Sequence, residues 1–242
     1  GMQSFALYGT GFLPPLPTPV LTLDATTFGS NQQHTLSMSL PSVYPCPATV
    51  LGYVNLAFTS AVGLVADDPT VVFISGSTRA LDFAVGANGT QVLIAGQANA
   101  VFNTGSTAGK ITLSVTANGL QINGDPTTTL TIPPATVSID NASASNQILG
   151  QLDVSLTGFD NTYTAGVMSF TFFDSNGNTI GSTISADFTS NFKNFFAAQA
   201  AGSTFRALLS FLVTGNQAQV ASVAVTLTNA AGQAQTGKLT FQ

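Results

Sequence analysis

The feature that most constrains this chain is an alternation of apolar and polar residues that occurs twice, in Leu36-Ser37-Met38-Ser39-Leu40 and in Leu152-Asp153-Val154-Ser155-Leu156. Successive side chains of a strand point to opposite faces, so each segment predicts a β-strand with one buried face. The two segments are 116 residues apart, and Leu23-Asp24 recurs at the same offset as Ile139-Asp140. The pattern predicts two consecutive β-domains built to one plan.

Composition favours the same fold class. Only 6% of the 242 residues are charged, with ten acidic residues that are all Asp, and 44% are apolar. Surface helices are usually rich in Glu and Lys, whereas Thr, Val and Phe favour strands. A domain of ~100 residues is typical of an immunoglobulin-type sandwich. We therefore predict an all-β chain of two consecutive immunoglobulin-like β-sandwich domains, with one short helix in the second.

Proline positions suggest where the domains divide. Residues 1–19 combine a strand-like segment with four prolines, which is typical of the closing strand of an upstream immunoglobulin-like module followed by a linker. Alternatively, the segment adds a strand to the first domain. The first domain is expected at 20–132 and the second at 136–242. Between them, the prolines of 133–135 should give a short and stiff linker.

One segment departs from the strand pattern. From Phe188 to Gly202, phenylalanines recur at intervals of four and three residues, which places them on one face of a helix. Thr189 or Ser190 is the expected N-cap and Gly202 the expected terminator. We predict a short helix packed by its phenylalanines on the second sandwich.

Charge and cysteine content exclude several classes of function. The net charge is −5, and the five basic residues are spread along the chain, so no basic surface for nucleic acid is expected. No apolar run is long enough to span a bilayer. Cys46 is the only cysteine, flanked by two prolines, and is interpreted as a packed thiol with no disulfide partner. One Cys and one His are too few for a zinc site.

Catalytic residues are not evident, and no catalytic or cofactor site is predicted. His34 is the only histidine and is interpreted as a solvated loop residue, since no Gly-x-Ser-x-Gly nucleophile motif accompanies it. Glycoside cleavage would need a pair of carboxylates. The only adjacent pair is Asp67-Asp68, which precedes Pro69 and is interpreted as a turn with local hydrogen bonds.

Calcium is the one metal for which the sequence offers weak ligands. Asp67 and Asp68 could be joined by Asp82 from a neighbouring strand, because calcium takes six to eight oxygen ligands. The segment Asp174–Asn178 resembles a calcium loop superficially, but it lacks the closing Glu and instead predicts a type I′ hairpin turn at Asn176-Gly177.

Carbohydrate binding is the main functional alternative, because sandwiches often serve it. The chain has no Trp, and its four tyrosines, Tyr8, Tyr44, Tyr53 and Tyr163, are scattered, so no stacking platform is evident. Asn88-Gly89-Thr90 and Asn141-Ala142-Ser143 satisfy the glycosylation sequon, which matters only in a eukaryotic secretory host.

Several strand-and-turn motifs resemble those of tandem immunoglobulin-like domains near the C-terminus of large secreted or surface proteins of bacteria. In the first half these are Asp67-Asp68-Pro69 and Ala108-Gly109-Lys110-Ile111-Thr112-Leu113. In the second half they are Thr157-Gly158-Phe159, Gly202-Ser203-Thr204-Phe205 and Val225-Thr226-Leu227-Thr228-Asn229. The resemblance implies an extracellular pair of β-sandwiches and supplies no catalytic residue.

These observations predict a non-enzymatic, exported spacer or adhesion module of a larger bacterial surface protein. The expected partners are a glycan or a protein at the cell surface and neighbouring immunoglobulin-like domains of the same parent chain, with no nucleic acid, no membrane insertion and no cofactor. The alternative is a carbohydrate-binding accessory module of an exported enzyme.

Overall fold

A computed structural model describes residues 14–46, 48–198 and 202–242, and most of their regular structure is β-strand. The contacts divide the chain into two units. The first comprises the described residues up to Phe58, together with Val71–Thr104 and Ile111–Leu130. The second comprises Thr59–Thr70, Gly105–Lys110 and Thr131–Gln242. The segments 59–70 and 105–110, which the sequence boundaries place in the first domain, therefore belong to the second unit by their contacts.

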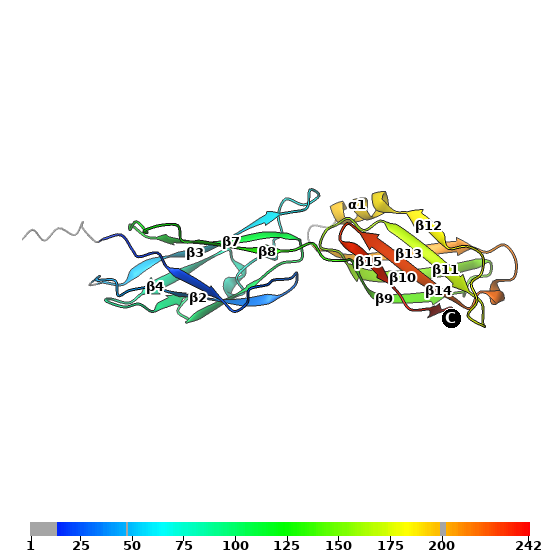
Figure 1. Cartoon of the computed structure of the whole chain (residues 1–242), viewed down its shortest axis with the longest axis horizontal. Coiled ribbons are helices and arrows are strands. Elements are labelled where there is room, and N and C mark those ends of the chain that lie inside the picture. The colour runs from blue at the N-terminus through cyan, green and yellow to red at the C-terminus, as the bar shows by residue number, and fades with distance from the viewer. Residues whose placement is uncertain (1–13, 47, 199–201) are drawn as a thin grey trace, which may run out of the picture. The chain divides into compact units, whose positions relative to one another are not determined.

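The described strands of the first unit form two sheets, and β2, β3, β4, β7 and β8 are labelled in Figure 1. The three-stranded sheet has the order β1-β2-β6, and the five-stranded sheet has the order β5-β4-β3-β7-β8. The first contains β1 (Val20–Leu23), β2 (Gln33–Ser39) and β6 (Asn99–Asn103). The second contains β3 (Val50–Ser60), β4 (Ala80–Val85), β5 (Val92–Ile94), β7 (Gly109–Ala117) and β8 (Thr127–Ile132). The ends of β3, β7 and β8 extend into the second unit.

The described residues of the second unit also form two sheets, with one α-helix (Figure 1). One sheet has the order β13-β10-β9, and the other has the order β12-β11-β14-β15, with β16 also paired to β14. Their strands are β9 (Ser138–Ser145), β10 (Gln151–Phe159), β11 (Val167–Phe173), β12 (Ile184–Asp187), β13 (Thr204–Leu212), β14 (Ser222–Asn229), β15 (Gly232–Gln235) and β16 (Leu239–Thr240). The helix α1 spans Thr189–Ala198.

Strand order identifies these sandwiches as immunoglobulin-like, which confirms the predicted fold class. An immunoglobulin sandwich has strands A, B and E in one sheet and strands C, F and G in the other. In the second unit β9, β10 and β13 occupy the A, B and E places, and β11, β14 and β15 occupy the C, F and G places, with β12 beside β11. The sheets β1-β2-β6 and β4-β3-β7-β8 have the same order.

The two alternating segments of the sequence, 36–40 and 152–156, bury their apolar side chains as predicted. Leu36 and Met38 in β2, and Leu152, Val154 and Leu156 in β10, are at most 4% exposed. Both strands are the central strand of a three-stranded sheet. The apolar residues of each strand therefore enter the core, and the intervening polar residues face away from it.

Two parts of the first half differ from what local sequence indicates. The segment 70–75 is rich in β-branched and aromatic residues, which favour a strand, but the structure has only isolated bridges from Phe73 to Thr78 and Phe102, followed by a short 3₁₀-helix at Ser75–Ser77. The strand β6 was not expected. Its pairing with β2 is a contact across the sequence, which local propensity does not reveal.

Helix α1 confirms the predicted helix but not its predicted N-cap. Phe192 and Phe196 are buried, and Phe196 contacts the rings of Tyr163 and Phe205 edge-on. Thr189 is already helical, and its amide donates to the carboxylate of Asp187 at 2.8 Å. The carboxylate of Asp187 therefore accepts one of the N–H groups that the first turn of the helix leaves without an intrahelical partner. Gly202, the predicted terminator, has a positive φ of 116°. Residues 199–201, which separate it from Ala198, lie outside the described residues, so the termination itself stays a prediction.

The described part of the proline-rich N-terminal segment packs within the first unit. Leu16 is fully buried, and its amide donates to the carbonyl of Gln121 at 2.7 Å, while Asn123 donates to the carbonyl of Leu16 at 2.9 Å. The expectation that 1–19 begins with an upstream closing strand concerns mainly residues 1–13, which lie outside the described residues.

Candidate functional site

Asp68, one of the three predicted calcium ligands, is only 2% exposed and lies in the second unit. Its Oδ1 accepts hydrogen bonds from the amide and the hydroxyl of Thr70, at 3.0 and 2.5 Å. Its Oδ2 accepts from the amides of Ser106 and Thr107, at 2.7 and 2.9 Å, and from the Ser106 hydroxyl at 3.1 Å. The carboxylate therefore ties the segment 59–70 to the segment 105–110.

The electrostatics of Asp68 suit a structural role. Burial alone would raise the pKa of the Asp68 carboxyl, but hydrogen bonds from Thr70, Ser106 and Thr107 outweigh burial and hold the pKa below its ordinary value. A general acid in glycoside cleavage needs a raised pKa instead. Asp68 therefore lacks the electrostatics of such an acid.

The other predicted calcium ligands do not complete a site. Asp67 is exposed, and Asp82 is an exposed residue of β4 in the first unit. Within 14–46, 48–198 and 202–242, no three His, Cys, Asp or Glu side chains form a group that could hold a metal ion. Calcium binding therefore stays a prediction from sequence, without a ligand geometry to support it.

The hairpin at Asp174–Asn178 is held by its own first carboxylate. Asp174 Oδ1 accepts hydrogen bonds from the amides of Asn176 and Asn178, at 2.9 and 2.8 Å. Gly177 has a positive φ of 83°, whereas Asn176 does not have one. The predicted type I′ turn is therefore wrong, because such a turn needs positive φ at both central residues.

A second buried carboxylate, Asp160, was not singled out from the sequence. Its Oδ1 accepts from the Thr162 amide and hydroxyl and from Asn229 Nδ2, and its Oδ2 accepts from the amides of Thr164 and Ala165. The signal was present, since Asp160-Asn161-Thr162 has the same Asp-x-Thr pattern as Asp68-Pro69-Thr70. In both cases the Thr amide and hydroxyl bind one carboxylate oxygen.

His34 lies in β2 with its side chain 12% exposed, so the prediction of a solvated loop histidine is wrong. Its Nδ1 is 2.9 Å from Asp24 Oδ1 and its Nε2 is 3.1 Å from Gln32 Oε1, and the ring packs edge-on against Phe28. A catalytic histidine needs a nucleophile at one nitrogen. Here the two ring nitrogens of His34 face oxygen atoms of Asp24 and Gln32. The interaction of His34 with Asp24 therefore orients the connection between β1 and β2.

The tyrosines do not provide a sugar-stacking platform among the described residues. Tyr44 is buried, and its hydroxyl donates to the carbonyl of Pro14 at 2.5 Å. Tyr163 is also buried, with its hydroxyl 2.9 Å from the hydroxyl of Thr107. Tyr53 in β3 is 45% exposed, and Tyr8 lies outside the described residues. Only Tyr53 therefore presents a ring to solvent in the described part of the chain.

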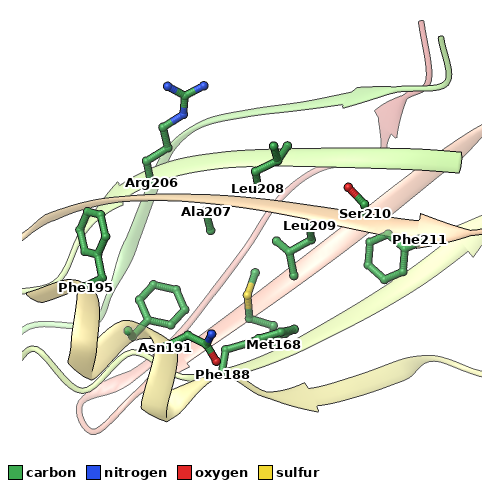
Figure 2. Close-up of a pocket in the computed structure, with 11 residues that line it drawn as sticks. Met168, Phe188, Asn191, Phe195, Arg206, Ala207, Leu208, Leu209, Ser210 and Phe211 are labelled. Carbon is green, nitrogen blue, oxygen red and sulfur yellow. The ribbon is translucent and has the colours of Figure 1, made fainter. Parts of the chain in front are cut away.

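A largely apolar groove lies beside strand β13 in the second unit (Figure 2). It has a volume of about 470 Å³ and lies between β13 and α1. Leu209 and Phe211 of β13 face into it opposite Met168, while Arg206, Leu208 and Ser210 point to the other side of the strand (Figure 2). The remaining lining comes mainly from α1 and the residue before it, Phe188, Asn191, Phe192 and Phe195.

Strand β13 borders this groove as an edge strand. It pairs with β10 on one side, and the described strand order places no strand on its other side. In an immunoglobulin constant-type sandwich a further strand, D, lies next to E in this sheet. Here the chain between β12 and β13 contains α1, so the place beside β13 is not filled by a described strand.

Comparisons with known proteins gave structural likenesses only. No protein-family model and no curated protein matches the sequence. Among 43 matching chains of solved structures is a chimeric titin Z1Z2 carrying an exogenous KLER peptide from decorin, with 17% identity over 93% of this chain and 96% of that one, at a TM-score of 0.23. Bovine butyrophilin has 11% identity over 96% and 97%, at a TM-score of 0.31.

The FN1–FN3 domains of chicken CNTN1 match with 12% identity over 93% of this chain and 67% of that chain, at a TM-score of 0.26. The strand order of each unit identifies the fold. No helix among the described residues is long and apolar enough to cross a membrane.

Proposed function

We propose that the chain is a non-enzymatic structural or adhesion module of a larger bacterial surface protein. The observation that carries the proposal is the use of the buried polar groups. Asp68 and Asp160 each accept at least five hydrogen bonds from nearby loops, and Asp160 also binds the side chain of Asn229. Among the described residues, no buried side-chain nitrogen or oxygen is without a partner.

This arrangement supports a structural role because catalysis needs polar groups directed at a substrate. The buried carboxylates point inward and stabilise loops, and the histidine is held by Asp24 and Gln32. Low charge also suits an extracellular surface that binds by hydrogen bonds and apolar contact, without long-range electrostatic steering. Export to the cell surface is part of the proposal and rests on the resemblance of the strand-and-turn motifs.

A panel of glycosidase, esterase and peptidase substrates tests the non-enzymatic part. We expect no turnover by the full chain. Turnover that disappears in His34→Ala and Asp24→Asn, with both variants still folded by circular dichroism, would overturn the proposal. The full reading frame of the gene tests the surface location, which requires an export signal and neighbouring extracellular domains in the parent protein.

Carbohydrate binding is the second candidate, and the exposure of Tyr53 is the observation that favours it. Tyr53 pairs with Asp82 across β3 and β4, so an exposed ring lies beside a hydrogen-bonding carboxylate. A glycan array with the full chain discriminates the two functions. No binding supports the structural or adhesion module, whereas binding lost in Tyr53→Ala and retained in Tyr53→Phe supports the carbohydrate module.

A further inference from the structure

Strand β13 has the properties of an unprotected edge strand. The strand has nine residues, Thr204–Leu212, and apolar side chains occur on both of its faces. On the face that points away from the core, Leu208 is 68% exposed and Leu212 is 85% exposed. Proteins usually protect edge strands with charges, prolines or bulges, because free backbone groups recruit another strand. Strand β13 contains no proline, its register with β10 has no shift, and Arg206 is its only charged residue.

The backbone groups on the free side follow from the ladder to β10. At one end Ser203 accepts from the Asp160 amide at 2.8 Å, and at the other end Val213 donates to the Gly150 carbonyl at 2.9 Å. In an antiparallel ladder, alternate residues direct their N–H and C=O groups to the same side. The backbone N–H and C=O groups of the odd-numbered residues therefore bond to β10. The same groups of the even-numbered residues point to the free edge, and these residues are Thr204, Arg206, Leu208, Ser210 and Leu212.

We propose that this edge pairs with strand β13 of a second copy of the chain, antiparallel and centred on Leu208. The register that pairs the whole strand with itself places Leu208 opposite Leu208, Arg206 opposite Ser210 and Thr204 opposite Leu212. The five even-numbered residues of each copy, whose backbone groups point to the free edge, then exchange about ten backbone hydrogen bonds with the other copy. The contact has two-fold symmetry, as most homodimer interfaces do.

Charge complementarity in this register favours a second copy. Ser210 lies opposite Asp153 in the β10–β13 ladder, and its hydroxyl donates to Asp153 Oδ1. Strands lie ~4.8 Å apart, so Arg206 of one copy would face Asp153 of the other across about 10 Å between backbones, within reach of a long arginine side chain. Two-fold symmetry creates this Arg–Asp pair twice, in a chain with only five basic residues.

The side chains on the groove side of β13 are also complementary in size. The same register places Ala207 opposite Leu209, so a small residue meets a large one, and it places Phe205 opposite Phe211. Leu209 and Phe211 line the groove in Figure 2, which the second copy would shield from solvent at the strand edge. On the opposite face of the paired strands, each exposed Leu208 is shielded on one flank by Leu208 of the other copy. This self-association goes beyond the proposed function and requires no glycan or protein ligand.

Sedimentation velocity of the full chain over a concentration series tests the proposal. We expect a reversible dimer with a Kd on the order of 1–100 μM, since a strand-edge contact lies at the small end of protein interfaces. Leu208→Lys should weaken the dimer about tenfold or more, because two like charges meet at the two-fold axis. Ser155→Lys is the matched control, since Ser155 pairs with Leu208 one strand away from the edge.

A monomer at all concentrations up to about 1 mM would overturn the proposal, as would a dimer that Leu208→Lys leaves unchanged or that Ser155→Lys weakens equally. Should Leu208→Lys fail to fold by circular dichroism, a charge exchange provides the second test. Arg206→Asp should weaken the dimer, and Arg206→Asp combined with Asp153→Lys should restore it. Failure of the combined variant to recover the dimer would overturn the register.

Discussion

At the scale of residues, the second unit depends on two buried carboxylates that bind amides. Asp68 holds Ser106 and Thr107, and Asp160 holds Thr164 and Ala165. Hydrogen bonds from amides to an ionised carboxylate are stronger than neutral ones. Each aspartate thus organises a loop that has no regular structure of its own.

Asp68→Asn should destabilise the second unit by about 1–3 kcal/mol, because an amide group cannot accept at both positions and would face N–H groups with its own donors. Urea denaturation of the full chain, followed by tyrosine fluorescence and circular dichroism, measures the change. Asp125→Asn removes an exposed carboxylate and should leave the midpoint unchanged. Equal midpoints for both variants would contradict the role of Asp68.

The pKa of Asp68 predicts how stability depends on pH. Because the folded-state pKa lies below the ordinary value of about 3.9, the unfolded state binds more protons near that pH. The contribution of Asp68 is therefore fully present above about pH 5 and is lost as pH falls through the folded-state pKa. Thermal melting between pH 6 and pH 2 should show a steeper loss for the wild type than for Asp68→Asn, and parallel curves would contradict this.

At the scale of elements, helix α1 contributes to the core of the second unit through its phenylalanine side chains. In α1, Phe196 is fully buried among Tyr163, Phe192, Phe195 and Phe205. The helix therefore closes part of the core at the edge where β13 has no further strand beside it.

Phe196→Ala should cost about 3–5 kcal/mol, the usual cost of removing a fully buried phenylalanine ring. Phe196→Asp should unfold the second unit, because it also buries a charge. Lys193→Ala, on the exposed face of the same helix, is the control and should change stability by less than about 0.5 kcal/mol. Differential scanning calorimetry measures all three, and normal melting of Phe196→Asp would show that α1 is not packed.

Gly158 and Gly52 each lie under a phenylalanine of the adjacent strand, Phe205 and Phe83 respectively. A Cβ on Gly158 would lie 2.0 Å from the Ser138 carbonyl oxygen and 2.6 Å from the Phe205 ring. Gly158→Ala should therefore destabilise the second unit by about 1–3 kcal/mol through overpacking, although Ala usually favours ordered structure over Gly. Gly237→Ala has open space and should be neutral in the same melting experiment. A neutral Gly158→Ala would contradict the close approach.

Sequence reasoning located most elements but not the surfaces that depend on strand neighbours. Alternation identified β2 and β10, and phenylalanine spacing identified α1, because these patterns are local. The segment Val71–Ile74 has strand-like composition but forms only isolated bridges, since a ladder depends on a distant partner. For the same reason, the free edge of β13 cannot be recognised from its sequence, because it depends on which strands lie beside it.

At the scale of the whole molecule, the second unit is assembled from three separate parts of the chain. The segments 59–70 and 105–110 join residues 131–242. Val62, Leu64 and Val65 pack against the second core, and Ala108 donates to the carbonyl of Asn161 at 2.9 Å. The Ser203 hydroxyl also donates to the carbonyl of Ser106 at 2.6 Å.

A fragment of residues 134–242 should consequently melt at a lower temperature than the second unit does in the full chain, because it lacks both segments. Calorimetry of the fragment and the full chain provides the comparison, with the heat signal of the second unit assigned through Phe196→Ala. A fragment that melts cooperatively at the full-chain temperature would show that the two segments add no stability.

The scattered origin of the second unit limits how this protein could be rearranged during evolution. A recombination event that copied only the last hundred or so codons into another gene would omit the segments 59–70 and 105–110. The transferred unit would then lack two segments that pack against the rest of it. Both halves are therefore expected to be inherited together, as a single cassette.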